Sequence, residues 1–347
     1  MRFFKKKYYY FIICYFLTCY FTFGKEKNIF LKEKKQNFNT SNLILEHIKD
    51  SHNWEICSGK IRIPLPIILW DNNFIIFSSS LFKNKKKIAK KNGKYYIIFK
   101  EKIYKTNSYG RRILNTIGNP INKKPIDLSI TKNVFITFIS SIILYIIFLL
   151  MSFSYQNYKN RWKIGKILEP LLLLVRNIIA IPNIGINYKK YFSFLLTTFF
   201  FILFNNILGL FPSTPNITGN INTTLFLSII VFIFFIFHAN KSYWKHTFCL
   251  KQIPVLIRFL LFPIEFISML IRPFTLCIRL FANITAGHIL NLSIISLIFI
   301  FKNILIIGVS IPFLLFISLL EFLVSFLQAF IFTSLSALLI GASIKRE

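Results

Sequence analysis

The chain has 347 residues, of which 54% are hydrophobic, and 42 of them are phenylalanine. Its formal net charge of +31 comes mostly from lysines in the N-terminal third, but no basic-aromatic binding motif accompanies them, so no nucleic-acid partner is expected. No phosphate loop, dinucleotide fingerprint, nucleophile elbow or CxxC pair occurs. The sequence therefore predicts no catalytic site of its own, no cofactor and no metal.

Residues 1–24 have a basic start and an apolar core, which predicts a secretory signal peptide. No small-x-small pair precedes Lys25, so an uncleaved N-terminal anchor is the alternative. Residues 25–132 are polar and rich in lysine, and we interpret them as a small region outside the membrane.

Three runs in this region are typical of short β-strands: 60–70, 73–82 and 94–100. The lysine-rich run at 83–91 is expected to be a solvated loop. A small extracytoplasmic region containing strands is therefore predicted before the first membrane helix.

Residues 133–347 are predicted to be an all-α polytopic membrane domain, because their apolar runs reach the roughly 20 residues that a spanning helix needs. Five spanning helices are expected, at 133–153, 191–211, 223–239, 253–301 and 304–344. The run at 167–185 contains Glu169, Pro170 and Arg176, and so favours an amphipathic helix at the interface over a further span.

Basic residues cluster after the first span and again at 240–252, which places both segments in the cytoplasm by the positive-inside rule. The uncharged segment 212–222 then forms an outer loop. The predicted topology has the N-terminal region outside and the C-terminus in the cytoplasm.

The last two segments are about twice as long as a bilayer requires, roughly 60–75 Å at 1.5 Å per residue. Either each is a steeply inclined helix or each breaks into two pieces. A turn is expected at 301–303, and a register that pairs His288 with Glu321 favours the first reading, a pair of long inclined helices in an antiparallel hairpin, because a break would put Glu321 in a loop.

Polar residues occur inside this hairpin, where a charge costs about 2.5–3.5 kcal/mol on insertion scales. A register centred on the turn pairs His288 with Glu321, and Arg279 with Gln328. Histidine titrates near neutral pH and can exchange protons with a neighbouring glutamate. Arg279 keeps its charge and needs a carboxylate, which this chain does not offer at the same depth. We therefore expect the partner of Arg279 to come from another subunit.

The motif IRLFANITAGHIL (278–290), together with LLEFLVSFLQAFIFTSLSALLIG (319–341), resembles subunit a of the F-type ATP synthase. The similarity extends over NNILGLFPSTPNITGN and INTTL and covers about 133–345. The segments DSHNWEI, IPLPIIL and DLSITKN resemble the extended N-terminal part of one bacterial branch of that family.

The resemblance implies a proton-translocating stator subunit that offers two half-channels to a carboxylate on the c-ring, with Arg279 as the essential arginine between them. Asn283 and Gln328 match polar residues near that arginine, and Asn206 matches a channel residue. His288 and Glu321 occupy channel positions that many relatives fill in the opposite order. Gly209 stands where some relatives have an aspartate.

The implied partners are the c-ring, the peripheral-stalk b subunits, the lipid bilayer and, indirectly, the F1 sector, in a bacterial inner membrane. The residues favour protons over sodium as the coupling ion, because the relay groups titrate. A secondary transporter or ion channel is the alternative reading, although such proteins usually have internal repeats, and none is seen here. A membrane scaffold that transports nothing is a third.

Overall fold

The computed structural model describes residues 50–55, 62–71, 73–83, 88–91, 93–99, 101–110, 113, 122–156, 163–210, 214, 216–240, 243–244, 255–301 and 304–344. The chain forms two compact units, the first containing the described residues up to Phe138 together with Thr214, and the second containing the rest. The predicted signal peptide at 1–24 lies outside the described residues.

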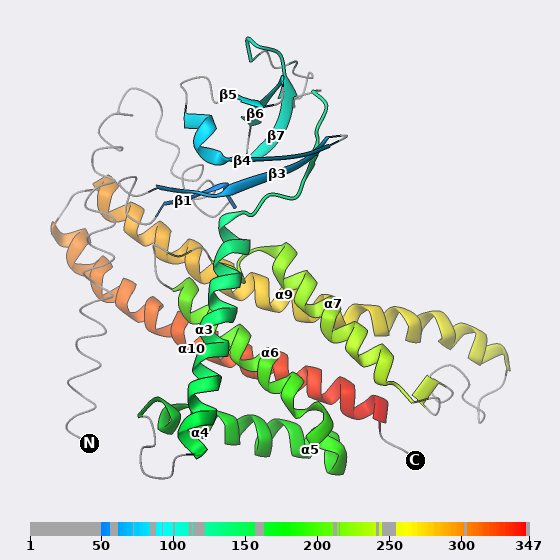
Figure 1. The fold of residues 1–347 in the computed structure, drawn as a ribbon. Helices are drawn as coiled ribbons and strands as arrows, with labels where there is room; N and C mark the ends of the chain where they lie inside the picture. The colour runs from blue at the N-terminus through cyan, green and yellow to red at the C-terminus, as the bar shows by residue number, and fades with distance from the viewer. Residues whose placement is uncertain are drawn as a thin grey trace. The chain divides into compact units, whose positions relative to one another are not determined.

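The first unit is built from short antiparallel strands (Figure 1). They are β1 (Asn53–Glu55), β2 (Arg62–Pro64), β3 (Pro66–Asp71), β4 (Asn73–Ser78), β5 (Ile88–Lys91), β6 (Lys94–Phe99), β7 (Lys102–Thr106) and β8 (Ile126–Asp127), with the 3₁₀ helix η1 (Ser79–Lys83) after β4. Strand β1 pairs with β2, and the others form two three-stranded sheets with the orders β4-β3-β8 and β5-β6-β7. The prediction of a strand-containing N-terminal region is confirmed.

Alternation along the strands builds the core of this unit, because successive side chains point to opposite faces of a sheet. Leu69 of β3 and Phe77 of β4 are buried, and the ring of Phe77 stacks on that of Tyr96 in β6 at 6.1 Å. The predicted solvated loop at 83–91 was wrong at its C-terminal end. Strand β5 forms there because Ala89 is buried beside its partner Tyr96.

Among the described residues, the first α-helix is α3 (Lys132–Gln156), whose first residues belong to the first unit. The others are α4 (Lys163–Leu174), the π-helical turn η2 (Val175–Ala180), α5 (Ile181–Ile184), the 3₁₀ turn η3 (Gly185–Asn187), α6 (Tyr188–Gly209), α7 (Ile221–His238), α9 (Val255–Phe301) and α10 (Ile304–Ile344). Among the residues that the structure describes, five segments are long and apolar enough to cross a membrane, in agreement with the five spans predicted.

The segment between 163 and 209 is not one straight helix. Pro170 lies inside α4, and Gly185 has a φ of +78°, a left-handed conformation that suits glycine and ends α5. The chain therefore turns before α6, as the prediction of a separate helix at 167–185 requires. Its position at the membrane interface stays a prediction.

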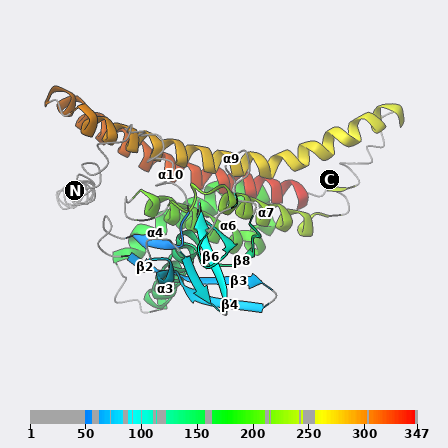
Figure 2. The same ribbon diagram turned by 90° about the horizontal axis from the view of Figure 1, so that it is seen from above.

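Helices α9 and α10 are continuous over 47 and 41 residues, which confirms the long hairpin and excludes two broken segments. Their ends at Phe301 and Ile304 agree with the predicted turn, of which residues 302–303 lie outside the described part. Figure 2 shows the two helices side by side, with α9 bowed so that its side away from α6 and α7 is concave. Pro263 and Pro273 lie inside α9, and proline bends a helix by removing a backbone hydrogen bond.

Candidate functional site

Arg279 lies on α9 between two buried residues of the helix face that packs on the core, Leu276 and Leu280. Its own side chain is half-buried. Within the part of the chain that the structure describes, it forms no hydrogen bond and no ion pair. A guanidinium keeps its positive charge and presents donors in a planar fork that matches a carboxylate.

Asn283 and Gln328 connect α9 to α10 one turn from Arg279. The Nδ2 atom of Asn283 donates a hydrogen bond to Oε1 of Gln328 at 3.0 Å. Gln328 is 1% exposed, so this bond satisfies one of its buried polar atoms. Gln328 thus contacts Asn283, which lies one helical turn from Arg279 in α9. Direct pairing of Gln328 with Arg279 stays a prediction.

Glu321 is a buried carboxylic acid on α10, and α9 supplies its surroundings. Asn291 donates a hydrogen bond from Nδ2 to Oε2 of Glu321. Gly287 lies directly against the same side chain, since a Cβ atom built on this glycine would meet Cδ, Cγ and Oε1 of Glu321 at 3.2 Å. The absence of a side chain at Gly287 therefore makes room for the acid.

His288, the predicted partner of Glu321, is half-buried and follows Gly287 in α9. It therefore lies at the depth that the register argument gave it. Its pairing with Glu321 stays a prediction. Asn291 was missed by the sequence reasoning, although it is three residues from His288 and so within one helical turn of it.

Asn206 places α6 against the same part of α10. Its Nδ2 atom donates to the backbone oxygen of Ser325 at 3.2 Å, and the hydroxyl of Ser325 donates to the backbone oxygen of Glu321 at 2.8 Å. We call Asn206, Gly287, Asn291, Glu321 and Ser325 the Glu321 cluster. Three helices, α6, α9 and α10, contribute to it.

Several buried oxygens of α6 and α9 have no hydrogen-bond partner among the described residues. They are Oδ1 of Asn205, Oδ1 of Asn206, Oδ1 of Asn291 and Oγ1 of Thr285. Buried polar atoms of this kind are usually satisfied by ordered water. Within the described part of the helical unit, these buried oxygens can each accept a hydrogen bond from ordered water.

Gly209 ends α6 beside the amide of Asn216. A Cβ atom at position 209 would lie 3.0 Å from Oδ1 of Asn216, which also accepts a hydrogen bond from the backbone nitrogen of Gly219 at 3.0 Å. The side chain of Asn216 thus fills the space that an acid at position 209 would need. A side chain added at position 209 would therefore require Asn216 to shift.

Comparison with known families gives two matches, on separate parts of the chain. Residues 134–341 match the family model described as "ATP synthase A chain". Residues 43–128 match a domain of unknown function, DUF8433. The first match covers more than half of the chain and includes every residue of the site described above.

Curated relatives give the same result. The chain is 44% identical over 232 residues to "ATP synthase subunit a 2" of Prosthecochloris aestuarii, covering 64% of this chain and 70% of the relative. It is 44% identical to "ATP synthase subunit a" of Chlorobium phaeobacteroides, covering 64% and 68%. It is 33% identical over 251 residues to "ATP synthase subunit a" of an Anaeromyxobacter species, covering 70% and 61%.

Proposed function

Because the chain belongs to the ATP synthase A chain family, we propose that it is the proton-translocating stator subunit of an F-type ATP synthase membrane sector. In this role it provides two half-channels to a carboxylate on a rotating ring of c subunits, and Arg279 separates them. The observation that carries the proposal is a half-buried arginine without an acid partner among the described residues, one turn from the Asn283–Gln328 hydrogen bond.

The inlet half-channel passes through the Glu321 cluster and His288. Protons come from the outer side, and the unpartnered oxygens of Asn206 and Asn291 accept hydrogen bonds from the water that carries them. Glu321 and His288 exchange protons with this water. A proton then passes to the ring carboxylate, which becomes neutral and can move into the lipid.

Arg279 acts at the other end of the rotation. After almost one turn the protonated carboxylic acid approaches the guanidinium, which stabilises its ionised form. At about 4 Å and an effective dielectric constant of 20 the attraction is roughly 4 kcal/mol. This corresponds to about three units of the carboxylic acid's pKa, so the proton is released toward the cytoplasm. Arg279 cannot pass on a proton itself, so protons cross only with rotation.

The shape of the hairpin supports a ring as the partner. The concave side of α9 is turned away from α6 and α7, and a convex cylinder fits against such a surface (Figure 2). The large side chains Phe274 and Ile278 of α9 are exposed, as expected of residues that face lipid or a neighbouring apolar helix. The b subunits and, through them, the F1 sector complete the proposed assembly, with the C-terminus in the cytoplasm.

The decisive experiment is ATP synthesis by membrane vesicles that contain the whole complex with Arg279→Ala. Synthesis driven by a proton gradient should fall to the background level, because the ring carboxylate no longer meets a cation. Arg272→Ala is the matched control, since it removes an equally charged, half-buried side chain from the same helix. It should retain synthesis.

The complex must first be shown to contain the variant chain and the ring in normal amounts. Sustained synthesis in a fully assembled Arg279→Ala complex would refute the proposal. Loss of synthesis in both variants would show that any charge removed from α9 disables the complex, and this would remove the special role given to Arg279.

A further inference from the structure

One face of the β4-β3-β8 sheet is apolar and exposed. The register pairs Ile68 with Ile76, Trp70 with Phe74, and Trp70 with Ile126, and the backbone nitrogen of Leu128 donates to the oxygen of Ile68. All of these side chains lie on the same face, since they alternate with the buried residues of each strand. We call this face the β3–β4–β8 patch, formed by Pro66, Ile68, Trp70, Phe74, Ile76, Ile126 and Leu128.

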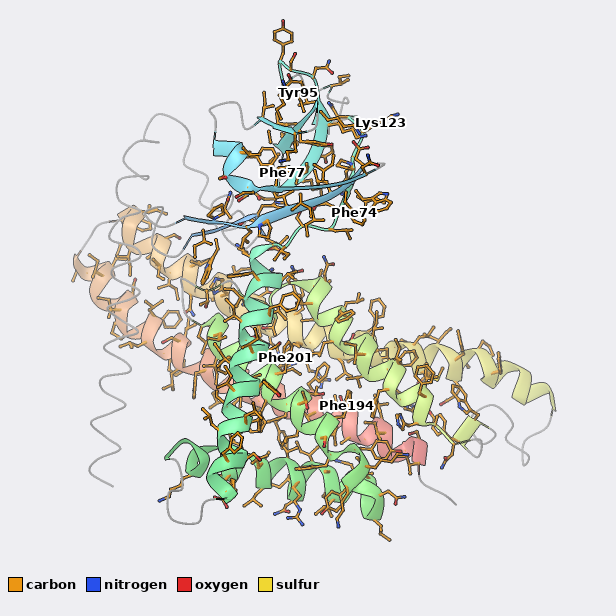
Figure 3. All side chains as sticks on the ribbon, viewed as in Figure 1. Phe74, Phe77, Tyr95, Lys123, Phe194 and Phe201 are labelled. Atoms are coloured by element: carbon orange, nitrogen blue, oxygen red, sulfur yellow. The ribbon has the colours of Figure 1, made fainter. Side chains whose placement is uncertain are left out.

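The exposure is large for residues of this type. Phe74 is 60% exposed, Ile76 59% and Ile126 62%, and the rings of Trp70 and Phe74 contact each other edge to face at 4.3 Å. The opposite face of the same sheet already packs in the core, and Figure 3 shows Phe77 there and Phe74 on the other side of β4. The core therefore does not explain the patch, and a contiguous exposed apolar face of this kind marks an interaction surface.

The patch is joined by a short stretch of chain to a membrane span. Ile130 is hydrogen-bonded to the backbone oxygen of Pro66, and α3 begins two residues later at Lys132. Two residues span at most about 7 Å of extended chain. The start of α3 is also fixed to the strands, because the nitrogen of Lys132 donates to the oxygen of Ser51 and the ring of Phe135 contacts Trp54 at 5.9 Å.

The residue types in the patch and beside it indicate that its partner is the surface of a lipid bilayer. Tryptophan and lysine are enriched where hydrocarbon gives way to headgroups, and lysine is attracted to anionic lipids. Trp70 lies within the patch, exposed Lys123 and Lys124 precede β8, and Lys132 follows it. A surface that binds another protein does not need tryptophan and lysine at these positions beside a membrane span.

We propose that the β3–β4–β8 patch docks on the lipid bilayer, with its apolar side chains at the boundary between headgroups and acyl chains. The N-terminal strand region is then a membrane-surface module that lies on the lipid beside the first span. This function goes beyond proton transport and assigns a role to the domain of unknown function.

The test uses the full-length protein in proteoliposomes. Phenylalanine replaces Trp54, Trp162 and Trp244, so that Trp70 is the only tryptophan. Phospholipids with bromine on the upper acyl chain should at least halve the fluorescence of Trp70 relative to unbrominated lipid, and aqueous iodide should have little effect. The matched control adds Trp70→Phe and Tyr109→Trp, because Tyr109 is exposed in the turn after β7. Its fluorescence should respond to iodide and not to bromolipid.

A second measurement guards against loosening of the domain by the tryptophan replacements. Two variants of the protein freed of its five cysteines each carry one spin label, at Ile76→Cys or at Tyr109→Cys. The two labels should differ in their accessibility to paramagnetic reagents in lipid and in water. The label at position 76 should favour oxygen, which concentrates in lipid, and the label at position 109 should favour a water-soluble nickel complex.

Two results would overturn the proposal. If Trp70 and position 76 respond to iodide and nickel as the control does, the patch lies in water. If they are shielded from aqueous and lipid reagents alike, protein covers the patch, either residues 1–49 or another subunit. Neither measurement depends on proton transport, so failure here would leave the proposed function untouched.

Discussion

At the scale of single residues, the contacts of Glu321 define what this acid can do. Its carboxylate is held by Asn291 from α9, and Gly287 gives it room. Asn291 also has a buried Oδ1 atom without a partner among the described residues. We therefore propose that Asn291 positions Glu321 and accepts a hydrogen bond from the water beside it.

Asn291→Leu tests this role. The substitution keeps the number of side-chain heavy atoms but removes both the donor to Glu321 and the acceptor for water, so proton conduction should fall by about tenfold, the equivalent of one hydrogen bond of roughly 1.4 kcal/mol. The measurement is passive proton flux through vesicles whose F1 sector has been stripped. Asn291→Gln should restore part of the flux, and equal flux in wild type and Asn291→Leu would contradict the role.

In the strand unit, His52 lies between two acidic side chains, Asp127 and Glu101. It is buried, with Nε2 3.3 Å from Oδ2 of Asp127 and Nδ1 3.9 Å from Oε2 of Glu101. Burial disfavours the imidazolium, but the hydrogen bond to Asp127 and the negative charges of both acids outweigh it and raise the pKa of His52 to about 9. Burial likewise opposes ionisation of Asp127, yet hydrogen bonds from His52 and Ser129 prevail and lower its pKa.

The stability of the strand unit should therefore depend on pH in a defined direction. Because the pKa of His52 in the unfolded chain is near 6.5, its contribution is complete below about pH 6.5 and is lost as the pH rises through about 9. The melting temperature of the strand unit should fall between pH 7 and pH 10, measured by Trp54 fluorescence in full-length protein whose other tryptophans are phenylalanine. His52→Gln should flatten this dependence, and an unchanged slope would exclude the cluster as its source.

At the scale of elements, the C-terminal part of α10 packs closely against α5. A Cβ atom at Gly341 would lie 2.0 Å from the backbone oxygen of Asn183, so the two helices approach as closely as a glycine allows. The nearby backbone oxygen of Ser343 also accepts a hydrogen bond from Asn240 at 3.2 Å. These contacts fix the end of the hairpin within the helical unit.

Gly341→Ala should therefore destabilise the helical unit. The added methyl group must push α10 away from backbone atoms, and overpacking of this kind costs about 1–3 kcal/mol. Thermal unfolding of the protein in detergent, followed by circular dichroism, measures the loss. Gly308→Ala is the matched control in the same helix, since its Cβ atom meets nothing within 4 Å. It should be neutral or stabilising, because alanine favours a helix by about 1 kcal/mol over glycine.

At the scale of the whole molecule, the hairpin of α9 and α10 sets the depth of every residue in the site. The register puts Gly287 against Glu321 and Asn283 against Gln328. Both contacts lie near the depths expected from a turn at 301–303. A slip of the hairpin by one turn would separate Glu321 from Gly287 and Asn291.

Crosslinking checks this register in membranes. In protein freed of its native cysteines, Gly287→Cys with Glu321→Cys should form a disulfide under mild oxidation, because a Cβ atom at position 287 would lie 3.2 Å from Cγ of Glu321, the atom that the cysteine sulfur replaces. Gly287→Cys with Ser325→Cys, one turn further along α10, should not. A reversal of this pattern would show that the hairpin has another register.

Membrane vesicles that contain the complex without these cysteine substitutions should synthesise ATP from a pH gradient alone if the coupling ion is the proton.

The sequence by itself determined the membrane spans, because apolar side chains over about 20 residues leave a helix across the bilayer as the only way to satisfy the backbone. It also located Arg279, since a charge in such a run is costly and conspicuous. The β5 strand was missed because most of its residues are lysines or apolar residues set among lysines, which are typical of a solvated loop, and only one residue, Ala89, is buried.

Only the tertiary structure decided which side chains touch. A hairpin turn fixes the depth of each residue but not its direction around the helix axis, and one residue changes that direction by about 100°. For this reason the contacts of Gly287 and Asn291 with Glu321 were found only in the structure, and the pairing of His288 with Glu321 stays a prediction. The apolar face of β3 and β4 likewise emerged only when the pairing of the strands placed Trp70 beside Phe74.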